Sequence, residues 1–102
     1  MNGSKPGVSA GLFADIAVVW AMHDATPVLV LVKLANAGRH AIHSFDNSRG
    51  HADLVFDATP ATLLAAGKTA MDAALAILAR MAVVTAHEQL GGAEALLFIA
   101  RD

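Results

Sequence analysis

Residue types that bind metals and carry protons near neutral pH gather between positions 40 and 57. The group consists of three histidines and three aspartates: His40, His43, His51, Asp46, Asp53 and Asp57. A metal site needs three or four such groups converging on one ion at about 2.0–2.2 Å. His40 and His43 are three residues apart, so on a strand they point to opposite faces. We therefore expect polar residues on a solvent-facing strand, with no metal and no cofactor. A metal-dependent enzyme that uses these histidines with Asp46 or Asp53 is the alternative.

Motifs for nucleophilic catalysis and for phosphate binding are absent. No serine lies in the Gly-x-Ser-x-Gly turn that exposes a nucleophile, and the chain has no cysteine. Gly67-Lys68-Thr69 resembles the end of a phosphate-binding loop, but the glycine that begins such a loop is missing. The segment also falls within a predicted helix. We therefore predict no catalytic residues and keep a small hydrolase built on the 40–57 region as the alternative.

Residues 40–46 and 51–57 predict a hairpin, because residues 47–50 have the composition of a turn. The simplest register places Asp46 opposite His51 and Ser44 opposite Asp53. An aspartate in that position can orient the imidazole of a histidine. Ligand pockets are mostly apolar with a few polar anchors. The candidate ligand-binding residues for a small apolar molecule are therefore Trp20, His43, His51 and Asp46.

Two further segments have the patterns of strands. Residues 28–34 are apolar on both faces as far as Lys33, which is typical of a central strand. In residues 12–24, large side chains alternate with small or polar ones, which favours a strand. Ser9 is placed to cap a helix over the same residues, so the helical alternative stays open.

Residues 60–80 predict one long helix with a wide apolar face. Thr59 is a good N-cap, and Pro60 suits the first helical position. With the strands, this helix predicts an α+β fold: an antiparallel sheet of four to six strands with the long helix packed on one face. Residues 12–102 are expected to form a single domain. The glycine-rich residues 1–11 are expected to form a flexible N-terminal leader.

The end of the helix decides what the rest of the chain does. A helix that ends near Arg80 is about 30 Å long and fits a compact domain. Residues 81–86 and 93–101 would then be strands. A helix that continues to Gln89 is about 45 Å long and extends beyond its own sheet to pack on a partner. We prefer the shorter helix and keep the longer one as the alternative.

The composition predicts self-association. Hydrophobic residues make up 56% of the chain and charged residues only 16%, against about 25% in typical soluble domains. A membrane span needs about 18–20 consecutive apolar residues. Charges interrupt each candidate, including Lys68, Asp72 and Arg80 in the long helix. The uncharged segment 95–100 would invite aggregation as an exposed edge strand. We therefore expect a soluble, cytoplasmic homo-oligomer with no membrane contact. A dimer is the first choice of oligomer.

The charge distribution gives no support for nucleic-acid binding. The net charge is −2 and the seven basic residues are dispersed, whereas nucleic-acid binding usually needs a basic patch. A regulator or toxin-type protein acting on nucleic acid through Arg39 and Arg49 is a further alternative. The sequence carries no motif that identifies a family. The expected function is that of a non-catalytic, soluble, homo-oligomeric module that binds a small apolar molecule or a protein partner.

Overall fold

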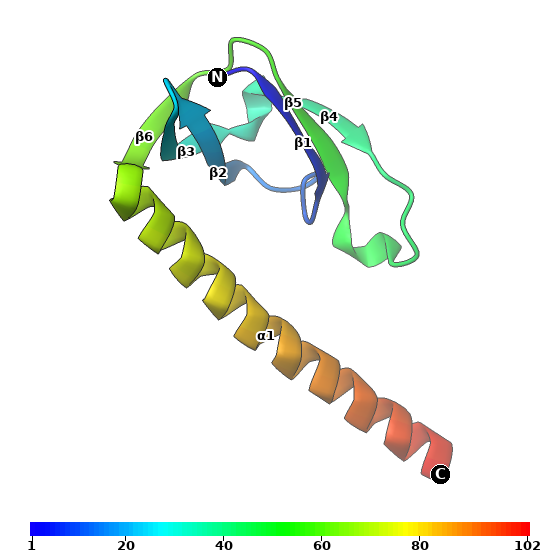
Figure 1. The fold of residues 1–102 in the computed structure, drawn as a ribbon. Helices are drawn as coiled ribbons and strands as arrows, with labels where there is room; N and C mark the ends of the chain where they lie inside the picture. The colour runs from blue at the N-terminus through cyan, green and yellow to red at the C-terminus, as the bar shows by residue number, and fades with distance from the viewer.

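The computed structural model describes all 102 residues and has an α+β fold, as predicted. Six strands form two antiparallel sheets of three strands each, and one long helix follows them (Figure 1). The strands are β1 (Gly3–Val8), β2 (Ile16–His23), β3 (Thr26–Lys33), β4 (Gly38–Ala41), β5 (Ala52–Phe56) and β6 (Ala61–Ala66). Two short 3-10 turns, η1 (Leu34–Asn36) and η2 (Asn47–Arg49), interrupt the connections. Helix α1 runs from Gly67 to Arg101.

The two sheets have the strand orders β1-β5-β4 and β2-β3-β6. β2 and β3 pair along their whole length, from Ile16 opposite Lys33 to His23 opposite Thr26. Asp24 and Ala25 between them both have positive φ, 47° and 61°, which is the backbone of a two-residue type I′ turn. The strand interpretation of residues 12–24 is therefore confirmed for 16–23.

The core lies between the two sheets and is small. Alternate residues of β3 point inward and meet β5, while one residue of β2 closes the cluster. Its fully enclosed members include Val32, Leu34 and Leu54, with 0–1% of their surface exposed. Only 13 of the 102 residues are buried. The other faces of both sheets therefore lie outside the core.

The predicted bounds of the helix were wrong at both ends. Thr59 does not cap a helix, because its amide donates to the Met1 carbonyl and its hydroxyl donates to the Asn36 carbonyl. Residues 61–66 form β6 instead, because the buried strand β3 needs hydrogen-bonding partners on both edges. The chain then turns at Gly67, whose φ of 60° suits glycine.

The C-terminal strands predicted at 81–86 and 93–101 do not exist. Helix α1 continues through both segments and through Gln89, for 35 residues and a length of about 52 Å. Alanine and leucine, which are strong helix formers, are the most frequent residues there, and no proline interrupts them. Their helix propensity outweighs the cost of the Gly91-Gly92 pair.

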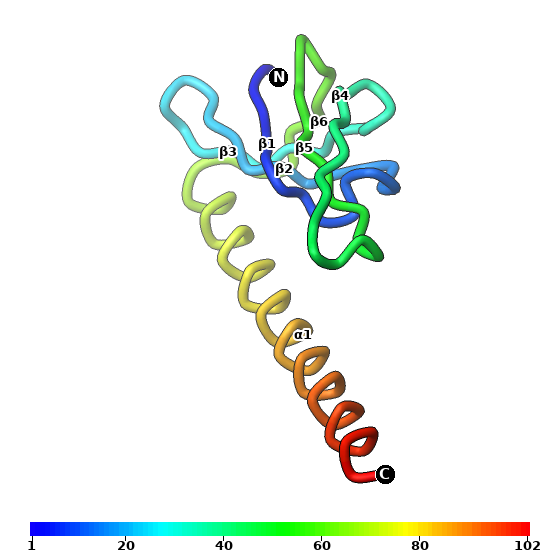
Figure 2. The backbone as a smooth tube through the Cα atoms, turned by 90° about the vertical axis from the view of Figure 1, so that its right-hand side faces the viewer, coloured from blue at the N-terminus to red at the C-terminus, as the bar shows by residue number.

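Helix α1 does not lie across a sheet. Its first turns contact β3 and β6, where Ala70 is fully buried, and the remaining turns extend away from the strands (Figures 1 and 2). The predicted single sheet of four to six strands is likewise divided into two. Residues 1–11, expected to be a flexible leader, contain β1, which pairs with β5.

The extended helix gives the molecule a large surface. The radius of gyration is 16.7 Å, against about 13 Å for a compact domain of this length. The accessible surface is 7337 Å², against about 5,400 Å² for a compact monomer of the same mass. The single chain therefore exposes about 1,900 Å² more than a compact fold would.

Candidate functional site

An apolar groove lies between the first half of α1 and the outer face of the β2–β3 hairpin. Its volume is about 420 Å³, and all nine residues that line it are hydrophobic. From the sheet come Val18, Trp20 and Leu29; from the helix come Met71, Ala74, Leu75, Ile77, Leu78 and Met81. We refer to these nine residues as the groove.

The side-chain periodicity of strand β2 and of helix α1 places apolar residues on both walls of the groove. Val18 and Trp20 are two residues apart on β2, so they share the face opposite to the buried Val19. Trp20 pairs with Leu29 of β3 across the hairpin. On the helix, Met71, Leu75 and Leu78 are three or four residues apart and share one face. The two apolar faces meet where the chain turns from β6 into α1.

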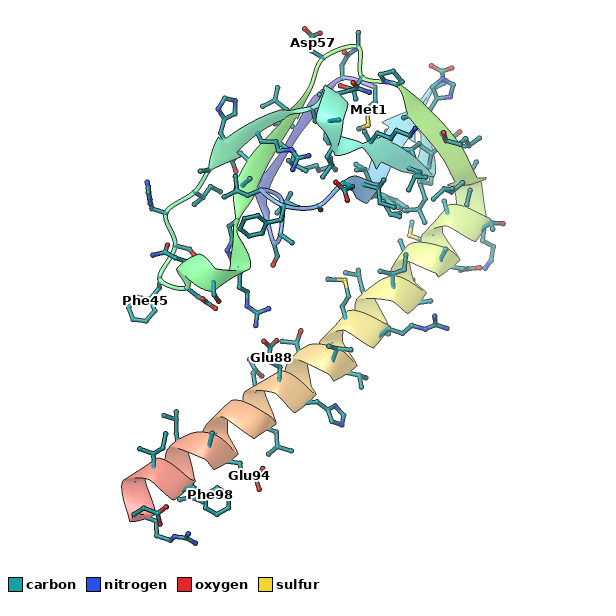
Figure 3. The ribbon with its side chains drawn as sticks, turned by 180° about the vertical axis from the view of Figure 1, so that it is seen from behind. Met1, Phe45, Asp57, Glu88, Glu94 and Phe98 are labelled. Atoms are coloured by element: carbon teal, nitrogen blue, oxygen red, sulfur yellow. The ribbon has the colours of Figure 1, made fainter.

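Charged pairs lie along the helix outside the groove. Lys68 and Asp72, one turn apart, form an exposed ion pair of 2.6 Å on the polar side. Further along, Arg49 of η2 forms an ion pair with Glu88. Figure 3 shows Glu88 on the side of α1 that faces the strands, whereas Glu94 and Phe98 project from the opposite side. The Arg49–Glu88 pair thus joins the hairpin loop to the middle of the helix.

A second, more polar cavity of about 900 Å³ lies near the N-terminal residues. It is bounded by residues 1–5, by the β2–β3 turn and by β6. Trp20 lines both this cavity and the groove, whereas His43, His51 and Asp46 line neither of the two.

The predicted polar site residues lie together, apart from Trp20. Asp46, His43 and His51 belong to the connection between β4 and β5, whereas Trp20 is on β2 of the other sheet. The Ser44 hydroxyl donates to the Asp46 carbonyl at 2.8 Å, and its oxygen lies 3.5 Å from His51 Nδ1. Hence Ser44 connects the backbone of Asp46 to His51.

Asp46 has a structural role in this loop. Its carboxylate accepts hydrogen bonds from the Ser48 hydroxyl and amide, at 2.5 and 3.0 Å, and lies 3.4 Å from Arg49 Nε. The Ser48 hydrogen bonds, helped by Arg49, lower the pKa of Asp46 below its ordinary value. The hydrogen bonds that Ser48 donates to the Asp46 carboxylate stabilise both the charged form of Asp46 and the 3-10 turn that it caps.

The predicted hairpin register differs from the one in the structure. β4 ends at Ala41, and His40 pairs with Asp53. The pairing of Ser44 with Asp53 is therefore wrong, and residues 42–51 form a long connection. It bends away from the ladder because Asp46 and Ser48 hydrogen-bond locally. No group of three or more His, Cys, Asp or Glu side chains is placed to hold a metal ion.

The two arginines of the nucleic-acid alternative are engaged within the protein. Arg39 Nη1 donates to the carbonyls of Gly11 and Leu12, at 3.2 and 3.0 Å. Arg49 is paired with Asp46 and Glu88. Phosphate contacts would have to compete with these internal bonds.

The sequence interpretation missed every helical residue of the groove. Their spacing was a usable signal, since the apolar residues at 71, 74, 75, 78 and 81 recur three or four residues apart on one face of a helix. Comparison of the chain with protein-family models, with curated proteins and with solved structures gives no match.

By length and composition alone, α1 is long and apolar enough to cross a membrane.

Proposed function

We propose that this protein is a non-catalytic, soluble module that acts by associating with a second copy of itself through helix α1. The observation that carries this proposal is the exposure of α1. Twelve of its large apolar side chains, between Met71 and Ile99, are 42–73% exposed. The wide apolar face of a helix is normally buried by neighbours. In the single chain, only its first turns have such neighbours.

The excess surface is large enough for a dimer. A stable interface buries about 800 Å² on each partner, and the chain exposes about 1,900 Å² more than a compact monomer of its mass. Covering half of that excess would already reach the usual size. A homodimer is therefore the first choice of assembly, and larger oligomers remain compatible with the same surface.

The groove is better suited to binding a protein partner than to binding a small molecule. Its volume of about 420 Å³ lies within the range of ligand pockets. A small apolar molecule bound there would nevertheless leave the end of α1 in water, including Leu96 and Leu97, which are 68% and 66% exposed. A second copy covers the groove and the distal helix together.

Membrane insertion of α1 is the second candidate, because the helix is long and apolar enough to cross a bilayer. Charged residues oppose it. A span of about 20 residues placed on the most apolar part contains Asp72 and Arg80. Each such charge at the centre of a bilayer costs about 2.5–3.5 kcal/mol. We therefore favour a soluble oligomer over a membrane protein, and propose that it is cytoplasmic.

Light scattering coupled to size exclusion, at micromolar concentration, tests the assembly. We expect a mass of at least twice the 10.5 kDa of one chain. Flotation with phosphatidylcholine vesicles, run in parallel, tests the membrane alternative. A monodisperse monomer contradicts the proposal, and quantitative flotation with the vesicles replaces it by the membrane candidate.

A further inference from the structure

The end of α1, residues 92–101, has the surface of a helix that is buried from several sides. We refer to this segment as the tail. Its bulky residues Leu96, Leu97, Phe98 and Ile99 are consecutive, so they point in four directions about 100° apart. All four are 45–73% exposed. The tail therefore needs an environment with more than one apolar wall.

The groove has two such walls and a matching length. One wall is the helix face from Met71 to Met81, and the other is the sheet face with Val18 and Trp20. Met71 to Met81 spans about 15 Å, and the tail spans about 14 Å. The groove is lined by hydrophobic residues alone, and the tail carries two charged side chains, Glu94 and Arg101, beside its four bulky apolar ones, so the apolar parts of the two surfaces can exclude water from each other.

The tail cannot fill the groove of its own chain. Helix α1 is continuous from Gly67 to Arg101, which keeps Leu75 of the groove and Leu96 of the tail about 32 Å apart. We propose that the groove of each copy is the docking site for the tail of a second copy. The exchange is reciprocal, as a two-fold dimer requires. This inference rests on the proposed self-association and specifies its interface.

The side chains along α1 fit this antiparallel arrangement. Leu78 and Met81 in the groove half are large, whereas Gly92 and Ala95 in the tail half are small. Large residues facing small ones allow two helices to approach closely. Leu96 and Ile99 pack on α1 of the other copy. Phe98, which projects from the opposite side in Figure 3, turns toward the sheet face with Trp20.

The charges along α1 are also complementary in an antiparallel pair. The groove half carries Lys68 and Arg80 against Asp72, one positive charge in excess. The distal half carries Glu88, Glu94 and Asp102 against Arg101; since Glu88 is already paired with Arg49, one negative charge is in excess. Antiparallel packing brings halves of opposite sign together, and a parallel pair would place like halves side by side. The opposed helix dipoles favour the same orientation.

Crosslinking tests the interface. Because the chain has no natural cysteine, only the introduced cysteines react with the crosslinker. The double variant Leu75→Cys/Leu96→Cys is treated with a short bismaleimide after light scattering has measured its mass. We expect a covalent dimer in at least half of the chains. The matched control is Leu75→Cys/Leu90→Cys, in which Leu90 lies outside the tail at the same 68% exposure as Leu96. The control and both single variants are expected to stay uncrosslinked.

A second measurement does not depend on the double variant. Trp20 is the only tryptophan and lines the groove. A Trp20→Phe chain with a nitroxide label on Leu96→Cys, mixed with the wild-type chain, should quench the Trp20 fluorescence, and the same label on Leu90→Cys should quench it less. If the protein is a dimer without these crosslinks or this quenching, docking of the tail is overturned while self-association stands. If the protein is a monomer, both proposals fail.

Discussion

The substitution Leu78→Ala tests whether the groove mediates association, because it should weaken dimerisation without changing the stability of the folded chain. Leu78 lines the groove and is 60% exposed, whereas Leu90 is 68% exposed and does not line it. Both are leucines in the same helix, and replacement by alanine preserves helix propensity at both. Leu90→Ala is therefore a matched control for Leu78→Ala.

The magnitude follows from the exposure. Complete burial of a leucine side chain contributes about 1.5–3 kcal/mol. Since Leu78 is 60% exposed in the single chain, covering it contributes about 1–2 kcal/mol in each copy. A two-fold interface contains the residue twice, so Leu78→Ala should weaken dimerisation by about 2–4 kcal/mol, which is roughly 30- to 700-fold in Kd. Leu90→Ala should change Kd by less than about fivefold.

Sedimentation equilibrium over nanomolar to micromolar concentrations measures both constants. Urea unfolding of the monomers supplies the second readout, because both residues are mostly exposed and their loss should change monomer stability by less than about 0.5 kcal/mol. Equal effects of Leu78→Ala and Leu90→Ala on Kd would refute the assignment of the groove as the interface. A fall of several kcal/mol in the monomer stability of Leu78→Ala would show that the groove belongs to the core instead.

Three other changes probe the rest of the structure. Leu54→Ala, at a residue only 1% exposed in the core, should lower the free energy of unfolding in urea by about 2–5 kcal/mol. Gly91→Ala fills open space on the helix and should stabilise α1 by about 1 kcal/mol, visible as greater helical circular dichroism; a loss of helicity would contradict this. Ser48→Ala removes the hydroxyl that lowers the pKa of Asp46, so an NMR titration should show that pKa rising toward 3.8. The Asp46 carboxylate contributes stability above its ordinary pKa and loses the contribution as the pH falls through the lowered value. An unchanged titration of Asp46 in Ser48→Ala would contradict that cause.

The strands that the sequence predicted correctly are those whose partners are adjacent in the chain. β2 and β3 are joined by a two-residue turn, so the alternation of side chains and the position of the turn define both strands locally. β1 and β6 were missed because their partners are distant. β1 pairs with β5 and β6 with β3, and neither Gly3–Val8 nor Ala61–Ala66 has a strong strand pattern of its own. Backbone hydrogen bonding to an existing edge determines these two strands.

The length of α1 was underestimated because compactness was assumed. A helix of about 30 Å fits within a domain of this size, and a longer helix must extend beyond it. That argument is sound for a chain that folds alone and has no force for one that buries its surface in an assembly. Thr85, Glu88 and Gly92 interrupt the apolar face beyond Met81, so its periodicity does not by itself carry the helix past Arg80. Helix propensity and the absence of proline beyond Arg80 were the better guide to where the helix ends.

Of the candidate site, Trp20 was recognisable from the sequence and the helical wall of the groove was not. A single tryptophan on an alternating strand is a natural pocket residue. Met71, Leu75 and Leu78 instead looked like the buried face of a helix packed on its own sheet. That pattern is the same for a face buried by the chain's own sheet and for one buried by another copy, so only the position of α1 distinguishes them.

If two copies associate as proposed, we expect the order of the tail to increase with association. Gly91 and Gly92 separate the tail from the rest of α1, and each glycine costs a helix about 1 kcal/mol relative to alanine. The side-chain hydrogen bonds beyond them join only Arg101 and Asp102. The two glycines make the end of α1 the part of the helix that frays most easily when nothing packs on it. The four bulky apolar residues of the tail also need packing to leave water. If a second copy supplies the groove, as proposed, the same contacts meet both needs, and residues 92–101 should fray less in the dimer than in the monomer.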